Sequence, residues 1–273
     1  MEYSNKMKIR YFVFLLAVLV AWGAEAQTAK RSVQSRTQGQ PRKTAVQRQR
    51  KTTVQSQRRQ QTKNPVYKDV TYVVNGTASG YADGEWVRLC VPAVRGLQAH
   101  DSVRVEGGKF HFTGKTKNVP YMQYLTIGEG MNKNITELLL EEGTINVELV
   151  AGEKKDRVTG TTHNDIYTPY RDSLNDIYTK IFACMTEASK LSNSQEDRES
   201  YNAGADMLRK KIVTVTYDYA SKNMTNWVGV YLFAQYYKRF SPEQNKALLA
   251  KMARKYGNLP ITAQIRKYVN KQK

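Results

Sequence analysis

Cysteine and histidine, the residue types most often found in redox and metal sites, are scarce in this sequence, which has two cysteines and three histidines. Cys90 falls in a strand-like segment on the same face as Trp86 and Arg88, and Cys184 lies on the apolar seam of a helix-like segment. In an exported protein, two cysteines allow one disulfide, Cys90–Cys184, if that helix packs on the outer face of the strand. The alternative is two free thiols that pack as small apolar residues. No reactive thiol is predicted, because neither cysteine lies at a helix start or in a cationic cluster.

The three histidines, His100, His111 and His163, are too far apart for a metal-binding motif. Two are expected in loops and His111 at an outward strand position. No His-x-x-x-His with an accompanying carboxylate occurs, so we predict no metal site. His163 stands near Asp165, but Asn and Asp before a helix commonly act as caps.

Glu141 and Glu142 form an adjacent carboxylate pair, but neighbouring strand residues point to opposite faces, so the pair indicates a turn rather than acid–base chemistry. The sequence has no Gly-x-Ser-x-Gly nucleophile motif and no phosphate-binding glycine loop. Three Asn-x-Ser/Thr triplets, at Asn75, Asn134 and Asn223, would accept glycans only in a eukaryotic secretory route. We therefore predict no catalytic residue, no cofactor and no enzyme activity.

The elements that hold these residues begin with strands in residues 65–163, where apolar and polar residues alternate. Turns containing Gly107-Gly108 and Gly143 predict two hairpins, one joining residues 101–105 to 110–112 and the other joining 138–140 to 145–149. Each strand has one apolar face, which predicts an antiparallel β-sandwich of about seven or eight strands. The alternating positions are Val70, Tyr72 and Val74; Val87, Leu89 and Val91; Val103 and Val105; Phe110 and Phe112; Leu138 and Leu140; and Ile145, Val147 and Leu149.

The apolar period changes to that of a helix in residues 164–273, which predicts a C-terminal bundle of about four or five helices and an α+β fold class. Thr168-Pro169 is expected to start the first helix, Ser194 to cap the second, and Ser241-Pro242 to start a later one that Gly257 stops. A third helix at about residues 227–237 and a last one at 262–271 complete the set. We expect the tyrosines of this region to pack in the helical core, and the alternative is a surface that binds glycans or partner proteins. These tyrosines are Tyr217, Tyr219, Tyr231, Tyr236 and Tyr237, with Trp227 nearby.

Residues 1–26 have the pattern of a secretory signal peptide. Basic residues precede an apolar run of about a dozen residues, and Ala24-Glu25-Ala26 resembles a cleavage site. Cleavage would leave an exported chain without a transmembrane segment, and an uncleaved N-terminal anchor is the alternative. The apolar run is too short to span a bilayer comfortably.

Residues 27–64 are rich in Gln and basic residues and contain no Asp or Glu, so we expect them to be disordered. More than half of the net charge of +19 lies there. The segment is either a solvated spacer or an attachment to an anionic envelope component such as lipopolysaccharide or anionic lipid. No aromatic residue is present for base stacking, and we expect no nucleic-acid partner. The candidate anion-contacting residues are Arg48, Arg50, Lys51, Arg58 and Arg59.

A series of short motifs runs in order over about residues 68–165. They are Gly80, Asp83-Gly84, Leu89, Asp101-Ser102-Val103, Gly108-Lys109-Phe110-His111-Phe112-Thr113-Gly114, Glu142-Gly143-Thr144-Ile145, Val158-Thr159-Gly160-Thr161 and Asn164-Asp165. This stretch resembles the domain of unknown function DUF4369, an N-terminal domain of exported proteins of Gram-negative bacteria that often precedes a thioredoxin-like domain. Neither a thioredoxin-like domain nor a Cys-x-x-Cys motif occurs in this sequence, so the resemblance transfers no functional residue.

These observations together predict a non-catalytic protein of the Gram-negative envelope, periplasmic or associated with the outer membrane. Its role would be binding or scaffolding for an unknown envelope protein or polymer. The alternative, which rests on the resemblance alone, is an accessory of a thiol–disulfide pathway that lacks a redox motif of its own.

Overall fold

The computed structural model describes residues 67–130, 133–152, 156–190 and 192–271. These residues belong to a single compact unit. The predicted signal peptide and the basic segment, with Arg48, Arg50, Lys51, Arg58 and Arg59, lie outside the described residues. No helix among the described residues is long and apolar enough to cross a membrane.

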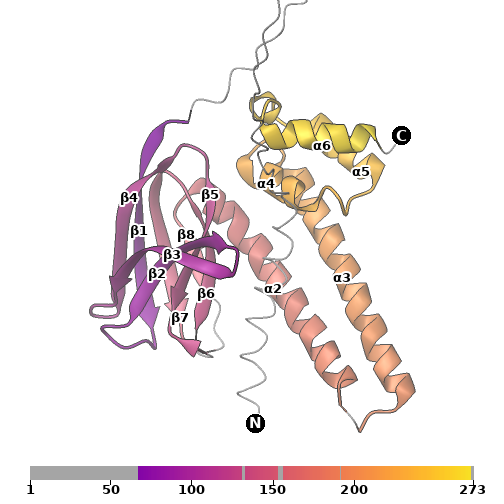
Figure 1. Ribbon diagram of the computed structural model, residues 1–273, viewed down its shortest axis with the longest axis horizontal. Helices are drawn as coiled ribbons and strands as arrows, with labels where there is room; N and C mark the ends of the chain where they lie inside the picture. Colours follow the sequence, from indigo (N-terminus) through magenta and orange to yellow (C-terminus); the bar gives the residue numbers. More distant parts are fainter. Residues whose placement is uncertain (1–66, 131–132, 153–155, 191, 272–273) are drawn as a thin grey trace, which may run out of the picture. The chain divides into compact units, whose positions relative to one another are not determined.

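The predicted α+β fold is confirmed, with eight strands in two sheets followed by helices in the described part of the chain (Figure 1). One sheet has the order β4-β1-β7-β8 and the other the order β3-β2-β5-β6. The strands are β1 (Asp69–Ser79), β2 (Trp86–Ala93), β3 (Gly96–Arg104), β4 (Lys109–Lys117), β5 (Tyr121–Ile127), β6 (Asn134–Leu140), β7 (Gly143–Val150) and β8 (Arg157–Thr159).

Both predicted hairpins are wrong in the same way. β3 and β4 lie in different sheets, as do β6 and β7, so each glycine turn carries the chain across the sandwich instead of pairing its flanking strands. At the first turn, Gly107 and Gly108 both have positive φ, which glycine adopts without steric cost. The Asp83 carboxylate accepts hydrogen bonds from both glycine N–H groups at 3.0 Å and fixes this crossing. The sandwich also contains one parallel pair, β1 with β7.

Five α-helices follow the described strands: α2 (Thr162–Ala188), α3 (Gln195–Asn223), α4 (Trp227–Tyr236), α5 (Pro242–Lys251) and α6 (Pro260–Asn270). A 3₁₀ turn, η2 (Arg254–Tyr256), separates the last two. The predicted caps at Ser194 and Ser241 are confirmed, because each hydroxyl accepts the N–H three residues on. The predicted stop at Gly257 is wrong, since α5 ends at Lys251 and Gly257 follows η2.

The predicted start of α2 at Thr168-Pro169 is also wrong. α2 begins at Thr162 and carries Pro169 inside it. A proline in a helix interior removes one backbone hydrogen bond. The helix extends N-terminally of Pro169 because its first turn is bonded to the sandwich, as described below.

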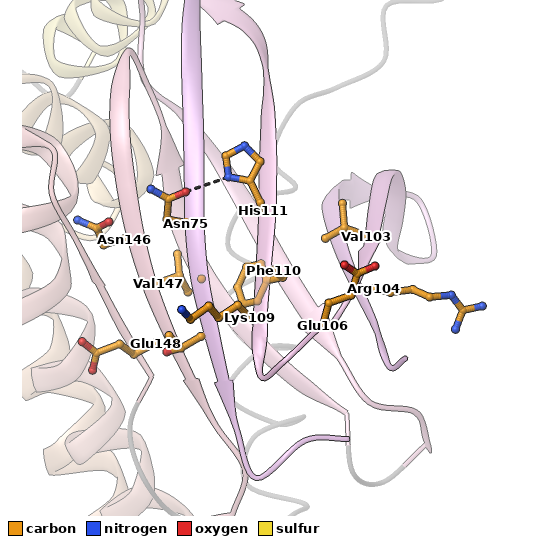
Figure 2. A pocket seen from close by; sticks show the side chains of 12 residues that line it. Asn75, Val103, Arg104, Glu106, Lys109, Phe110, His111, Asn146, Val147 and Glu148 are labelled. Atoms are coloured by element: carbon orange, nitrogen blue, oxygen red, sulfur yellow. Dashed lines mark hydrogen bonds between the residues drawn. The ribbon is translucent and has the colours of Figure 1, made fainter. Parts of the chain in front are cut away.

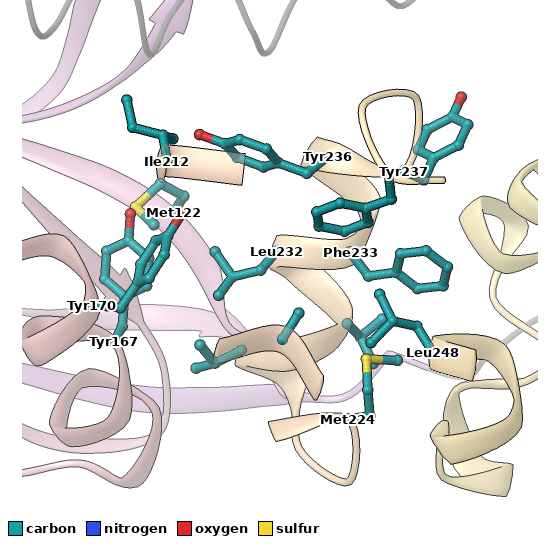
Figure 3. Close-up of a cluster of buried hydrophobic side chains, with 14 of the residues drawn as sticks. Met122, Tyr167, Tyr170, Ile212, Met224, Leu232, Phe233, Tyr236, Tyr237 and Leu248 are labelled. Atoms are coloured by element: carbon teal, nitrogen blue, oxygen red, sulfur yellow. The ribbon is translucent and has the colours of Figure 1, made fainter. Parts of the chain in front are cut away.

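Two hydrophobic cores share the middle sheet of this arrangement. The first lies between the two sheets and contains Val74, Leu89 and Phe112. The second lies between the helices and the outer face of β3-β2-β5-β6, where Met122, Tyr124 and Leu139 contribute (Figure 3). The helices therefore cover one outer face of the sandwich. On the other sheet, the outward residues of β1, β4 and β7 are mostly exposed and polar.

Candidate functional site

The carboxylate of Glu141 joins the sandwich to the first turn of α2. Thr161, the N-cap residue, makes no side-chain cap hydrogen bond, and Glu141 takes its place by accepting the N–H of His163 at 3.0 Å and of Asn164 at 3.3 Å. His163 Nδ1 contacts the second carboxylate oxygen. Burial raises the pKa of Glu141, but hydrogen bonds from the side chains of His163 and Thr161 outweigh it, and the pKa lies below its ordinary value. Glu141 and His163 thus hold a helix start.

Asn164 adds a second bond at the same joint. Its side chain donates to the carbonyl of Leu139 at 2.7 Å and accepts the N–H of Leu139 at 2.8 Å, as a neighbouring strand would. Asn164 is 1% exposed, so these bonds satisfy an amide that is costly to bury alone. The edge strand β6 is therefore tied directly to α2.

A buried polar cluster continues this joint along α2. The Tyr167 hydroxyl donates to the Glu137 carboxylate at 2.7 Å. Arg171 donates to the carbonyls of Glu137 at 3.1 Å and Asp156 at 2.7 Å. Burial raises the pKa of Glu137 above its ordinary value, although the Tyr167 hydroxyl and the charge of Arg171 act in the opposite direction. A carboxyl with a raised pKa is a candidate for acid–base chemistry. Here, however, the hydrogen bonds of Tyr167 and Arg171 to Glu137 join α2 to β6, so we assign the cluster a structural role.

The two cysteines are free in the structure. Cys90 is buried in the second core, so the predicted packing of helices against its sheet face is present although no bridge forms. Burial raises the pKa of the Cys90 thiol, which disfavours the thiolate. Cys184 is half-buried on α2, facing α3 beside Gly204. The alternative of two free thiols describes this structure.

The tyrosines of the helical region pack in or against the hydrophobic core, which is the first of the two roles predicted for them. Tyr236 and Tyr237 are buried and belong to the second core, with Tyr217, Tyr219 and Tyr231 partly buried against it (Figure 3). The alternative of an exposed tyrosine surface does not describe these five residues. The buried amide of Asn245 serves the same core by donating to the carbonyl of Tyr237.

The outward residues of the sheet β4-β1-β7-β8 are mostly exposed and polar, and they lie in rows that run across the strands. We call this surface the open face. Asn75 of β1 pairs with His111 of β4 on one side and with Asn146 of β7 on the other. In the next row, Thr77 stands between Lys109 and Glu148. Directly opposed residues lie about 5 Å apart at Cβ, so each row forms a continuous polar strip.

Residues of both rows help to line a hollow of about 860 Å³, together with Val103 of the other sheet and the core residues Phe110 and Val147 (Figure 2). Its polar lining comes from the two rows and from Arg104 and Glu106 at the corner between β3 and β4. Phe110 and Gly76 also line it and approach each other closely, since a Cβ at Gly76 would lie 1.9 Å from the Phe110 ring. Only glycine at position 76 allows this packing.

In the row formed by Asn146, Asn75 and His111, hydrogen-bond donors and acceptors lie side by side. His111 Nδ1 lies 2.9 Å from Asn75 Oδ1. Because an amide oxygen only accepts, the Nδ1 carries the proton in this bond and the Nε2 of a neutral ring is an acceptor. The Asn75 amide nitrogen, with two donor hydrogens, stands beside it. Such alternating groups suit a ligand rich in hydroxyls, which both donate and accept.

The sequence placed His111 at an outward strand position, as the structure has it, but it gave no reason to connect His111 with Asn75 and Asn146. His100 and His163 lie elsewhere, bonded to Gln123 and Glu141. The outward alternation of each strand was visible in the sequence. The register that sets the three residues in one row was not, because it depends on pairing β1 with strands about 40 and 70 residues later. No group of metal-ligating side chains occurs among the described residues.

Comparison with known proteins identifies one domain. Residues 72–167 match the family model described as a domain of unknown function, DUF4369. The match begins in β1 and ends at Tyr167, so it includes the open face and the Glu141–Asn164 joint to α2. No curated protein and no solved structure matches the chain.

Proposed function

From the DUF4369 domain that residues 72–167 form, we propose that this chain is a non-catalytic binding module of the Gram-negative envelope and that its open face binds a hydroxyl-rich envelope polymer. Export rests on the signal-peptide pattern of residues 1–26. The basic residues 27–64 would add a salt-sensitive attachment to anionic components.

The observation that carries this proposal is the asymmetry of the sandwich. One outer face is buried under helices, whereas the other is exposed and polar, and its two rows help to line a hollow of about 860 Å³. An exposed sheet face needs only scattered polar residues for solubility. Here amide and imidazole groups stand in register across three strands, where a chain of sugar hydroxyls could bond to several at once.

The proposed roles are specific. Asn75 would donate through its amide nitrogen while its oxygen holds His111. His111 would accept through Nε2, and Asn146 would supply both a donor and an acceptor. Hydrogen bonds of this kind contribute about 1 kcal/mol each, so removing both amides should weaken binding roughly tenfold or more.

The test is co-sedimentation of the purified full chain with insoluble polysaccharide and peptidoglycan from a Gram-negative envelope, at low and high salt. The double variant Asn75→Ala/Asn146→Ala should lose the binding that survives high salt. The matched control is Lys115→Ala, an exposed β4 residue of the same sheet outside the hollow, and it should bind as the parent does. If high salt abolishes all binding of the parent chain, or if both variants bind alike, the open face is not the binding site.

The accessory role in a thiol–disulfide pathway remains the alternative proposal. It predicts that the full chain captures a thioredoxin-like protein in a reductant-sensitive complex. Because burial disfavours the thiolate of Cys90, such a complex would have to form through Cys184 or without either cysteine. Loss of the complex in Cys184→Ser would favour the first route.

A further inference from the structure

The net excess of positive charge in the described part of the chain lies in its C-terminal region. Residues 67–223 contain 19 basic and 21 acidic side chains, so this stretch is close to neutral. Residues 224–271 contain nine basic side chains and one acidic one, Glu243. We call α4, α5, η2 and α6 the basic layer. Its nine cations are Lys238, Arg239, Lys246, Lys251, Arg254, Lys255, Arg266, Lys267 and Lys271.

All nine cations are exposed. Within the described residues they form no ion pair; the pairs found there involve other residues, such as Lys190 with Glu187 and Arg209 with Asp206 on α2 and α3. α2 and α3 thus neutralise part of their charge locally, and the basic layer does not. Gathering like charges on a short segment opposes folding by self-repulsion, which a polyanionic partner would relieve.

Aromatic rings lie beneath several of these cations. Lys255 Nζ stands 4.8 Å from the Tyr256 ring, and the Arg239 guanidinium stands 5.5 Å from the Tyr236 ring. Trp227, which is half-buried, packs its ring 6.0 Å from that of Tyr256. Tyr and Trp beside Lys and Arg are the side chains that proteins place at the level of lipid headgroups.

The apolar side of the layer is already used. Ile265 and Val269 of α6 are buried in the second core, as is Leu248 of α5. These helices therefore have no free apolar stripe to insert into acyl chains. Contact with a bilayer would be peripheral and electrostatic, through cations on α5, η2 and α6 and just after the ends of α4 and α6.

We propose that the basic layer is a docking surface for an anionic lipid bilayer. It is separate from the open face, because the open face belongs to the sheet β4-β1-β7-β8 and the layer to α4, α5, η2 and α6. It also goes beyond the predicted attachment through residues 27–64, since a folded surface would orient the sandwich on the membrane, whereas a tail would only tether it. Each basic residue near an anionic surface strengthens binding about fivefold.

The experiment measures partition of the full chain onto vesicles of equal parts phosphatidylcholine and phosphatidylglycerol, with pure phosphatidylcholine vesicles as the neutral arm. The layer variant is Lys255→Gln/Arg266→Gln/Lys267→Gln. Its matched control, Lys180→Gln/Lys210→Gln/Lys211→Gln, removes the same charge from exposed positions of α2 and α3. A third variant, Arg48→Gln/Arg50→Gln/Lys51→Gln, removes the same charge from the basic segment. Circular dichroism melting of each variant checks that the fold is retained.

We expect the layer variant to bind anionic vesicles about 100-fold more weakly than the parent and the control variant to lose only a few fold. The parent should not bind the neutral vesicles. Equal losses in the layer and control variants would overturn the proposal, because net charge alone would then explain binding. Parent-like binding by the layer variant, with loss only in the basic-segment variant, would also overturn it. Asn75→Ala/Asn146→Ala should bind vesicles normally, which separates this outcome from a failure of the open face.

Discussion

Replacing Glu141 by alanine should detach the start of α2 from the sandwich. The carboxylate accepts two backbone N–H groups of the first turn, from His163 at 3.0 Å and Asn164 at 3.3 Å, and it is only 8% exposed. Loss of an N-cap costs about 0.5–2 kcal/mol, and hydrogen bonds to a charged acceptor are worth about 1.5–3 kcal/mol. Because these contributions overlap, we expect Glu141→Ala to lower the free energy of unfolding by about 2–3 kcal/mol.

Glu141→Gln separates charge from geometry. The amide oxygen can still accept both N–H groups, so only the interaction of the charge with the helix dipole and with His163 is lost, at about 1 kcal/mol. The pKa of Glu141 is lowered in the folded state. Its stabilisation is therefore complete above the unfolded pKa near 4.3 and disappears as the pH falls through the lower folded value. The difference between parent and Glu141→Gln should shrink over that acidic interval.

The assay is urea unfolding followed by far-UV circular dichroism, with hydrogen exchange of the first α2 turn as a local readout. The control is Glu142→Ala, an exposed neighbour on the same turn, which should change stability by no more than about 0.5 kcal/mol. If Glu141→Ala is no more destabilising than Glu142→Ala, or if α2 exchanges no faster, then Glu141 does not cap the helix.

Three further substitutions test other parts of the fold by the same urea assay. Glu137→Gln should be more stable than the parent at neutral pH, and this gain should fade below about pH 4. The pKa of Glu137 is raised in the folded state, so ionisation of this carboxyl lowers the free energy of unfolding as the pH rises above the unfolded pKa. A difference that stays constant at all pH values would contradict this. Gly76→Ala should cost about 1–3 kcal/mol, since its Cβ would overlap the Phe110 ring, whereas the helical control Gly204→Ala, whose Cβ meets only ordinary contacts, should gain up to about 1 kcal/mol. Pro169→Ala should stabilise by about 1–2 kcal/mol by restoring a helical hydrogen bond, and a loss of stability would mean that the proline ring makes a necessary contact.

Local patterns in the sequence were enough to predict the elements of the fold and several of their ends. Alternation in residues such as Val70, Tyr72 and Val74 placed β1, and the caps at Ser194 and Ser241 placed α3 and α5. These features depend on neighbours within a few residues, which is the range over which dihedral preferences and capping bonds act.

Long-range partners explain what the sequence could not predict. A glycine turn between two alternating segments is compatible with a hairpin and with a crossing between sheets. Here β3 pairs with β2 and β4 with β1, and Asp83 holds the crossing through its bonds to Gly107 and Gly108. The start of α2 was predicted at Thr168-Pro169 because the anchoring carboxylate, Glu141, lies about 20 residues upstream. The open face was missed for the same reason, since its rows depend on register across distant strands.

The position of β1 has a consequence for the time course of folding. Tyr72 pairs with Gly114 on one side and with Gly143 on the other, so the first described strand has no sheet partner until much of the sandwich has been made. Pairing across such separations closes large loops, which slows folding relative to chains with local contacts. During N-to-C synthesis β1 therefore lacks its native sheet partners until β4, and then β7, have emerged. Such a delay should appear as refolding that is slow compared with that of chains with mainly local contacts.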